Sequence, residues 1–463
     1  MKRQTAPFRI SSGRLSSASE EPAERTKPMK NARYLTHGLA LAGLVVCSTA
    51  RADALADWSS NLHDAAKIAA QLPPLEARIV AMVQVAVFDA VNGIHREYEP
   101  YYVTERAPHG ARADAAVVGA AYTSLKALYP SQAATFDAEL AASLASLPGA
   151  NEAEAITRGL DWGEHVATLI LNLRSTDGSS AIYPPYLGST TTPGVWRSPP
   201  TATNPDGTLP AILPQWRYVT PFALASPDLF RPGPPPALTS VQYANDVNET
   251  EAVGSAASTV RTAEQTQLAL LWQAVGSVEM QGIALSCMPH ARLVDKARVL
   301  ALVGLTGNDA IIAIFDAKYT YNFWRPYHAI RLADTDNNPL TTPDTTWLSL
   351  IYPPPRHQEY PSAHAMFTGS IMRVLARELG DEHPFTLSST AYPSFTWSFT
   401  RFSDAVAQVK EARIWGGLHF RNSVNVGGKM GVALGDYVVR NVLRPLRGDR
   451  DDGDGAGHVE HRH

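Results

Sequence analysis

The chain has 463 residues, of which 45% are hydrophobic and 18% charged, and its formal net charge is −4. This composition is typical of a globular protein with one large domain or two smaller ones, and it excludes a chain that is disordered overall. Without residues 1–52, 31 Lys and Arg stand against 41 Asp and Glu, a net charge of −10. Such an acidic chain argues against nucleic acid or anionic lipid as the main partner.

Residues 1–52 are predicted to be a leader that contains a signal peptide. A short basic stretch begins at Met29 and precedes an apolar run at 39–46, and Ala50-Arg51-Ala52 has the small-residue pattern of a cleavage site. We therefore expect a periplasmic or secreted protein, with Met29 as an alternative start. A short membrane anchor and a buried helix are the other interpretations of the apolar run. No other stretch predicts a stable membrane span.

Apolar residues recur at helical spacing through most of the chain, which predicts an all-α helical bundle. The segment 175–259 differs, because it is rich in Pro, Thr, Ser and Gly but carries anchoring aromatics such as Trp196 and Trp216. It is predicted to be a long irregular segment that lies on the body. No stretch has sustained two-residue alternation, so no sheet is expected. The predicted helices cover 54–86, 111–128, 131–147, 151–174, 291–324, 363–379, 402–418 and 425–443, with another that starts at a capping box on Thr262.

This pattern divides the chain into a leader (1–52), an amino-terminal helical region (53–174), the irregular segment (175–259), a second helical region (260–445) and a tail (446–463). The acidic, His-containing tail is predicted to be disordered; loose binding of a divalent metal is the alternative.

Three short segments of the second helical region carry the candidate functional residues. In the first, Lys318 and Arg325 are seven residues apart, which predicts that they share one face of a helix that Pro326 ends. Neighbouring aromatic residues place this pair in apolar surroundings, where an unpaired charge is costly. A solvated basic edge of a helix is the alternative interpretation.

The second segment is Pro361-Ser362-Ala363-His364, at the start of a predicted helix. Ser362 is expected at the N-cap, where the free N–H groups of the first turn and the positive end of the helix dipole favour an anion. A plain serine cap followed by an incidental histidine explains this segment equally well when it is taken alone.

The third segment runs from Arg413 to His419, and Gly416-Gly417 between them allow a bend or a close approach. His419 taken alone is more often a buried structural histidine. Together, the three segments supply cations, hydroxyl and amide donors and two imidazoles. Three cations about 6 Å apart would repel by roughly 3 kcal/mol per pair, so the cluster predicts a bound tetrahedral oxyanion, phosphate or vanadate.

In this order the segments resemble the signatures Lys-x6-Arg-Pro, Pro-Ser-Gly-His and Ser-Arg-x5-His-x3-Asp. These are shared by vanadium-dependent haloperoxidases and the type 2 phosphatidic acid phosphatase superfamily. The resemblance covers roughly 260–445, and 75–102 also resembles the amino-terminal part of secreted bacterial haloperoxidase-like proteins. It implies an all-α fold and identifies 260–445 as the catalytic region.

In the haloperoxidase form, the resemblance implies a vanadate cofactor with His419 as its axial ligand. His364 is then the acid–base group that helps hydrogen peroxide to displace an oxygen, after which halide is oxidised. In the phosphatase form, His419 attacks a phosphate ester to form a phosphohistidine and His364 protonates the leaving alcohol. The residues that the resemblance assigns to oxyanion binding are Lys318, Arg325, Ser362, Ala363 through its amide, and Arg413.

Three positions depart from the family pattern: Ala363 replaces a glycine, Ala412 a serine, and Ser423 the aspartate that orients the second histidine. Loss of that carboxylate is expected to harm a nucleophilic histidine more than a vanadate ligand. This favours a haloperoxidase over a periplasmic phosphatase, and a non-catalytic oxyanion-binding protein is the third hypothesis.

His357 bears on the choice of halide. Family members that oxidise bromide can have a histidine at this place, which favours bromide or iodide over chloride; a surface histidine in a polar loop is the alternative interpretation. The sequence leaves the oligomeric state open, a homodimer included.

Overall fold

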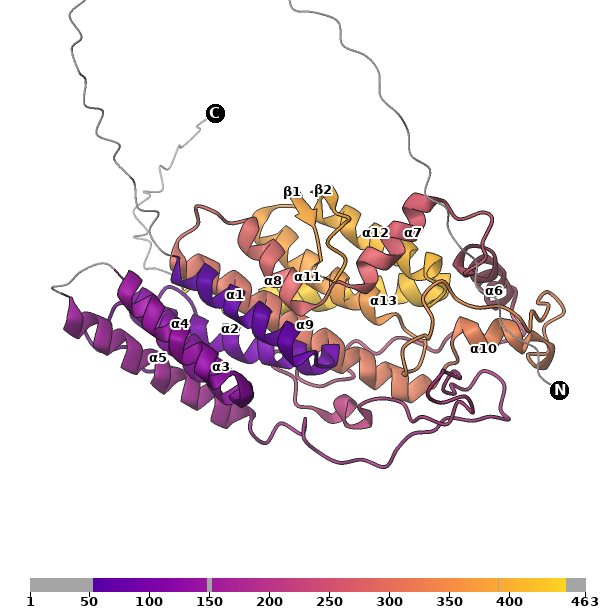
Figure 1. Cartoon of the computed structure of the whole chain (residues 1–463), viewed down its shortest axis with the longest axis horizontal. Coiled ribbons are helices and arrows are strands. Elements are labelled where there is room, and N and C mark those ends of the chain that lie inside the picture. The colour runs from indigo at the N-terminus through magenta and orange to yellow at the C-terminus, as the bar shows by residue number, and fades with distance from the viewer. Residues whose placement is uncertain (1–52, 148–151, 390, 447–463) are drawn as a thin grey trace, which may run out of the picture. The chain divides into compact units, whose positions relative to one another are not determined.

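Two long helices that are apolar on nearly every face, α2 (Pro73–His95) and α9 (Leu293–Tyr321), form the centre of the described structure. The computed structural model describes residues 53–147, 152–389 and 391–446. Within them α9 packs against α2 on one side and against α11 (Ala363–Leu379) on the other (Figure 1). A helix without a polar stripe has to be surrounded by other elements, and this explains the central place of α2 and α9.

Both central helices are also long and apolar enough to cross a membrane, as α7 (Ala263–Gln273) and α8 (Ser277–Ser286) would be if they formed one bent span. In the structure, other helices enclose α2 and α9, and 89% and 100% of their most apolar windows are buried. The prediction that no stretch beyond the leader has the composition of a span is therefore wrong. Burial within the protein accounts for the apolar character of both helices.

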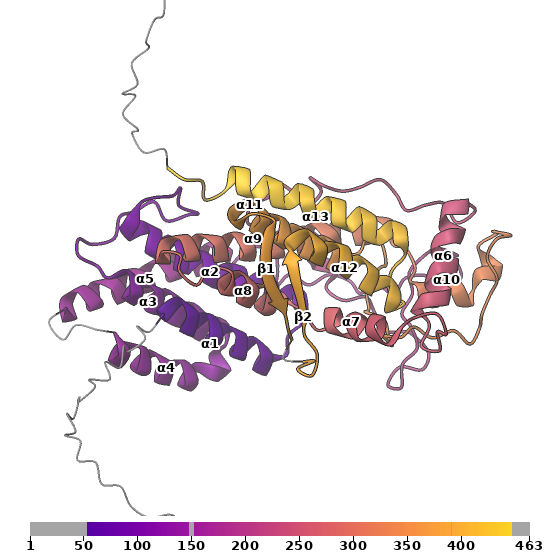
Figure 2. The ribbon, with the colours of Figure 1, turned by 90° about the horizontal axis from the view of Figure 1, so that it is seen from above.

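The carboxy-terminal layer contains α11, α12 (Phe402–Trp415) and α13 (Arg421–Asn441), and in Figure 2 α11 and α13 run side by side. Glycines at every fourth position of α13 face α11 across a very short gap. A Cβ at each of them would approach a carbonyl oxygen of Ser362, Met366 or Ser370 to 2.4–2.6 Å. The close approach fixes the start of α11 against α13. The glycines concerned are Gly427, Gly431 and Gly435.

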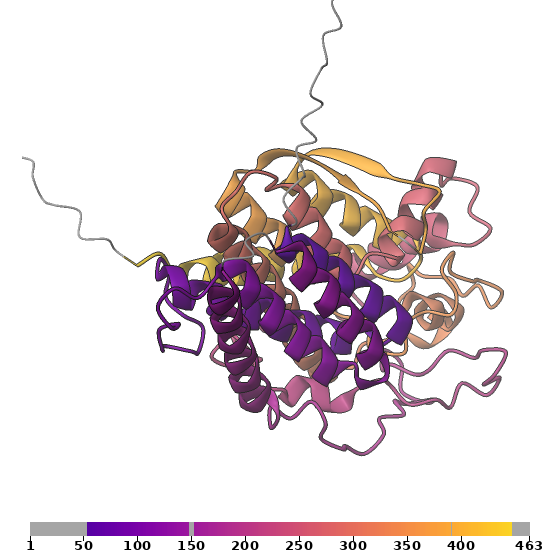
Figure 3. The same cartoon turned by 60° about the vertical axis from the view of Figure 1, so that its left-hand side comes forward.

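The amino-terminal layer packs on α2 and comes forward in Figure 3 as the indigo and purple helices. It comprises α1 (Ala54–Ala69), α3 (Ala113–Leu128), α4 (Ala133–Ser146) and α5 (Ala153–Arg174). The α3–α5 contact is again built on glycine, because a Cβ on Gly163 would lie 2.3 Å from the Ala116 carbonyl oxygen. The helices predicted at 111–128, 131–147 and 151–174 correspond to α3, α4 and α5. The one predicted over 54–86 is wrong as a single helix, because Ala70 is left-handed and Pro73 starts a new helix.

The irregular segment is anchored to the body by buried groups. Trp196 and Trp216 have no exposed surface, as their aromatic character predicted. The carboxylate of Asp309 on α9 accepts backbone N–H groups of residues 222, 223 and 224 at 2.7–2.9 Å, which pins the chain to the central helix. Three short 3-10 turns complete the connections: Pro130–Gln132, Pro214–Tyr218 and Ala333–Thr335.

Two predictions about secondary structure are wrong in detail. The segment 175–259 is not irregular throughout, because α6 (Val241–Gly254) lies within it, capped by the Ser240 hydroxyl. An antiparallel hairpin of β1 (Glu382–Leu387) and β2 (Trp397–Arg401) was also missed. Only two apolar residues alternate in each strand, Phe385 with Leu387 and Trp397 with Phe399, which is a weak signal in the sequence. The fold is nevertheless mostly helical, as predicted. The predicted leader at 1–52 and residues 447–463 of the predicted tail lie outside the described residues.

Candidate oxyanion site

The three signature segments lie at the end of α9 and the start of α10 (Pro326–Arg331), at the start of α11, and at the end of α12. Arg325 links two of them directly, because its Nη1 lies 3.1 Å from Nε2 of His419. Lys318 reaches the second segment through the carbonyl oxygen of Pro361 at 2.6 Å. The fold therefore brings together residues that are a hundred positions apart in the chain.

Lys318 and Arg325 do not share a helix, so that prediction is wrong. Asn322 adopts a left-handed conformation with φ 54° and ends α9 one turn after Lys318. The next residues are extended, and Arg325 is the N-cap of α10, with Pro326 at its first position. Both cations are nevertheless fully buried beside the same loop, 357–362, so the predicted apolar surroundings are confirmed.

Lys318 uses its ammonium group to hold that loop. Nζ lies 2.7, 2.8 and 2.6 Å from the carbonyl oxygens of Gln358, Glu359 and Pro361. Burial, together with Arg325, lowers the pKa of Lys318 well below its usual value. Three acceptors require three hydrogens, however, and only the charged ammonium has them. Lys318 is therefore charged, and its donors are engaged by the backbone.

Arg325 spreads its donors over both neighbouring segments. Nε donates to the His357 carbonyl at 3.0 Å and Nη1 to the Leu418 carbonyl at 2.9 Å. Nη2 lies 3.1 Å from Nδ1 of His357. Burial lowers the pKa of Arg325 to about 10, so the guanidinium stays charged at neutral pH. It fixes His357 and His419 relative to each other.

Arg413 lies in the last turn of α12 and keeps an unused donor. Its Nη1 donates to the side chain of Gln273 at 2.9 Å, while Nε is buried without a hydrogen-bond partner. Burial lowers its pKa to about 9, which still leaves it charged at neutral pH. After Arg413 the chain turns at Gly417, where φ is +70° and a Cβ would lie 2.5 Å from the carbonyl oxygen of Gly254. The glycine pair permits the close approach that the sequence predicted.

Ser362 is the N-cap residue of α11, as predicted, but its hydroxyl does not cap the helix. The hydroxyl is buried and has no hydrogen-bond partner. The amides of the first turn, that of Ala363 included, precede the first helical bond, which runs from Met366 to the Ser362 carbonyl. Unused hydroxyl and amide donors at a helix N-terminus are the groups that an oxyanion takes.

Glu359 is a residue that the sequence analysis missed. Its Oε1 lies 2.8 Å from Nδ1 of His419 and accepts the Phe420 amide at 3.1 Å, and both side chains are almost fully buried. The expectation that His419 lacks a carboxylate because position 423 is Ser is therefore wrong. The sequence offered one signal: Glu359 is an acidic residue immediately before the Tyr-Pro-Ser segment, in a loop with no other acid near it.

The cluster has an excess of positive charge. Lys318, Arg325 and Arg413 are opposed by one carboxylate, that of Glu359, whose pKa is raised to about 7 by burial against the lowering effect of Lys318 and Arg325. The excess is therefore at least two charges at neutral pH. An unpaired buried charge is costly, and a doubly charged anion restores the balance. The buried unpartnered donors of Ser362 and Arg413 fit phosphate or vanadate at this place.

The histidines of the cluster are neutral. Burial, and then the neighbouring cations, hold the pKa values of His357, His364 and His419 well below the usual range. A neutral imidazole has a lone pair, which can bind an electrophilic centre or accept a proton. His357, Ala363 and His364 are partly exposed, whereas His419 is buried. Solvent therefore reaches the cluster from the side of His364.

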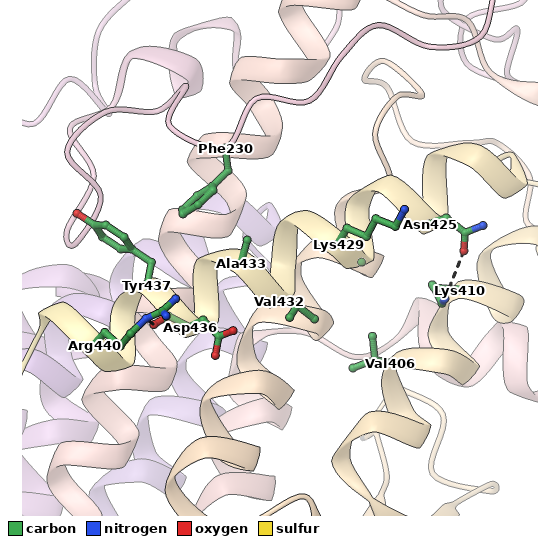
Figure 4. Close-up of a pocket in the computed structure, with 11 residues that line it drawn as sticks. Phe230, Val406, Lys410, Asn425, Lys429, Val432, Ala433, Asp436, Tyr437 and Arg440 are labelled. Carbon is green, nitrogen blue, oxygen red and sulfur yellow. Dashed lines mark hydrogen bonds between the residues drawn. The ribbon is translucent and has the colours of Figure 1, made fainter.

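A hollow elsewhere on the surface contains none of the predicted site residues. It lies along the outer face of α13 with Phe230 above it, as Figure 4 shows, and the ring of Phe230 meets Tyr437 edge-on at 5.9 Å. Lys410 at its end is held by Asn425 at 3.3 Å. This hollow is separate from the oxyanion cluster.

Fold and site together define a helical protein with a buried, positively charged cluster that contains three histidines. Residues 298–448 match the family model described as "VCPO second helical-bundle domain". Vanadium chloroperoxidase of Curvularia inaequalis is 27% identical in an alignment of 380 residues that covers 66% of this chain and 61% of that protein. Residues 298–448 therefore carry a domain of this type, and the chain is similar to vanadium haloperoxidases. It is thus homologous to oxidoreductases, although it spans only about three-fifths of the length of that relative.

Solved structures show the same fold. A bacterial vanadium-dependent iodoperoxidase matches with a TM-score of 0.74 and 22% identity, over 85% of this chain and 97% of the other. A bacterial vanadium-dependent chloroperoxidase in its apo form matches with a TM-score of 0.63 and 19% identity, over 79% and 93% of the two chains. These likenesses confirm the predicted fold class.

Proposed function

We propose that this chain binds vanadate and oxidises halide, bromide or iodide in preference to chloride, with hydrogen peroxide. The observation that carries the proposal is the buried excess of positive charge beside unpartnered donors of Ser362 and Arg413 and the lone pair of His419. Vanadate, when bound, supplies a Lewis-acidic centre that activates hydrogen peroxide without a change in the oxidation state of the metal.

The residues of the chain supply the rest of the site. His419 offers Nε2 as the ligand atom, while Arg325 and Arg413 balance the charge of the oxyanion and the Ser362 hydroxyl and Ala363 amide donate to its oxygens. Lys318 contributes its charge while it holds the loop. His364, neutral and partly exposed, can accept a proton from hydrogen peroxide and return it to the leaving oxygen.

The preference for bromide or iodide rests on His357. Its ring lies against Phe315, with the ring centres 5.7 Å apart, and beside the guanidinium of Arg325. We also propose that the protein acts in the periplasm or outside the cell.

A phosphatase that works through a phosphohistidine is the second candidate. The carboxylate of Glu359 favours it, because a carboxylate on Nδ1 is what a nucleophilic histidine needs. This removes the argument against a phosphatase that rested on Ser423.

One preparation can separate the candidates. The apo-protein is incubated with orthovanadate, and bromination of a phenolic dye with hydrogen peroxide is compared with phosphate release from a phosphate ester without vanadate, with His419→Ala as the control. Vanadate-dependent bromination that His419→Ala abolishes supports the proposal. Phosphate release without bromination of any halide contradicts it and selects the phosphatase. If both assays fail while vanadate still raises the melting temperature, the chain is a non-catalytic oxyanion-binding protein.

A further inference from the structure

We infer that Glu359 is the positioning residue of His419. Its carboxylate accepts a hydrogen bond from Nδ1–H, and this leaves the lone pair of Nε2 for the oxyanion. The related family pattern places a carboxylate four residues after this histidine, on the helix that follows it. In this chain that position is Ser423, and the carboxylate comes from the loop before α11 instead. This inference deepens the proposed function and rests on His419 as the group that engages the oxyanion.

The contact between the two side chains is direct and excludes water. Glu359 Oε1 and His419 Nδ1 are 2.8 Å apart, and the side chains are 0% and 1% exposed. The hydroxyl of Ser423 lies farther from the same nitrogen, at 3.4 Å. Of the two groups beside Nδ1, the carboxylate is therefore the nearer and the stronger acceptor.

Arg325 identifies which nitrogen of His419 carries the proton. Its Nη1 lies 3.1 Å from Nε2, and a guanidinium can only donate hydrogen bonds. Nε2 must therefore be the acceptor, without a hydrogen of its own. A neutral imidazole then has its proton on Nδ1, facing Glu359. Two independent contacts thus select the same tautomer.

Glu359 itself is held rigidly, as a positioning residue has to be. Its amide donates to the Phe323 carbonyl at 2.9 Å, and its own carbonyl accepts from Lys318 at 2.8 Å. The side chain also accepts the amide of Phe420, the residue next to His419. Lys318 therefore acts on His419 through Glu359, which gives the lysine a second task besides its charge.

The test uses the full chain with three variants. Glu359→Gln keeps the shape and removes the charge. Glu359→Gln combined with Ser423→Asp returns a carboxylate from the α13 side. Glu378→Gln, at the far end of α11 and paired with Arg298, is the matched control for loss of a partly buried carboxylate. Vanadate affinity is measured by calorimetry, and the protonated nitrogen of His419 by 15N NMR of the histidine side chains, with His419→Ala to assign the signal.

We expect Glu359→Gln to weaken vanadate binding about 10- to 100-fold and to change the 15N shift of Nδ1, which loses a charged acceptor, while Arg325 still donates to Nε2 and keeps the proton on Nδ1. The added Ser423→Asp should recover a large part of the affinity, and Glu378→Gln should stay within about twofold of the parent. A proton on Nε2 in the unmodified apo-protein overturns the inference, and so does an unchanged Nδ1 shift or an unchanged affinity in Glu359→Gln. If that variant does not fold, the tautomer of the unmodified chain decides.

The inference and the proposed function fail in different ways. If the unmodified chain neither binds vanadate nor oxidises halide, the proposed function is wrong. The NMR measurement on His419 needs no vanadate, so it tests the role of Glu359 independently of the proposed function.

Discussion

The carbonyl oxygen of Ser362 lies directly against Gly427, so closely that a Cβ at 427 would approach it to 2.5 Å. Ser362 also donates its amide to the Ser423 carbonyl at 3.2 Å. The start of α11, where the unpartnered hydroxyl and amides of the site lie, is therefore positioned by the first two turns of α13. Packing between two helices sets the geometry of the oxyanion site.

Gly427→Ala is expected to separate α11 from α13 and to displace Ser362. The strain of an added methyl at such a contact costs about 1–3 kcal/mol of unfolding free energy, and vanadate affinity should fall with it. Chemical denaturation measures the unfolding free energy, and calorimetry measures the vanadate affinity. Gly282→Ala is the control, because Gly282 lies within α8 with nothing near its Cβ position and should be neutral or slightly stabilising. Equal stability of the two variants would contradict the expectation.

Lys318→Met is expected to lower the free energy of unfolding by about 3 kcal/mol or more, because it leaves three buried carbonyl groups without a donor. Urea denaturation without any oxyanion measures this loss. A lysine that served only to bind the anion would instead stabilise the empty protein when removed, since it would relieve repulsion with Arg325 and Arg413. Lys67→Met, at an exposed position of α1, should change stability by less than about 0.5 kcal/mol.

Gln273→Glu is expected to make the empty protein more stable and to weaken its binding of vanadate and phosphate by about tenfold or more. Gln273 is the hydrogen-bond partner of Arg413, so a carboxylate there would neutralise part of the charge that attracts the anion. The melting temperature of the empty protein should rise, while the anion affinity measured by calorimetry should fall. Gln242→Glu adds the same charge at an exposed position of α6 and serves as the control. Unchanged affinity in Gln273→Glu would show that the net charge does not govern binding.

Most of the helical fold was predictable because the apolar spacing that marks a helix is local. The start of α11 at Ala363 and the capping box at Thr262 were predicted to the residue, since caps are set by neighbouring side chains. The end of α9 was not, because the left-handed turn at Asn322 is one of several conformations that the sequence allows there. The hairpin depends on pairing between residues that are 10 to 19 positions apart in the chain.

The site likewise has features that the local sequence determines and features that depend on distant contacts. The convergence of Arg325 and His419 follows from the motifs, whereas the pairing of Glu359 with His419 depends on how a loop folds sixty residues away. Spacing along the chain carries no information about such a contact. The use of all three Lys318 donors by backbone carbonyls was equally invisible, because a motif gives the type of residue but not its partners.

Acid should destabilise the protein in part through His328 of α10. The ring is 7% exposed, its Nδ1 has no hydrogen-bond partner, and burial, with Arg197 and Arg331 nearby, lowers its pKa to about 3. In the unfolded chain a histidine binds its proton near pH 6.5. Between these values the unfolded state holds more protons, so stability is full above about pH 6.5 and falls as the pH drops toward 3.

His328→Phe is therefore expected to reduce the loss of stability between pH 7.5 and 5.0 by about 2 kcal/mol, the cost of the proton that the unfolded state takes up over this range. Urea denaturation at the two pH values measures the difference. His290→Phe, at an exposed position, should leave the pH dependence as in the parent. If His328→Phe and the parent lose the same stability on acidification, His328 takes up its proton in the folded protein and is not held neutral by its burial.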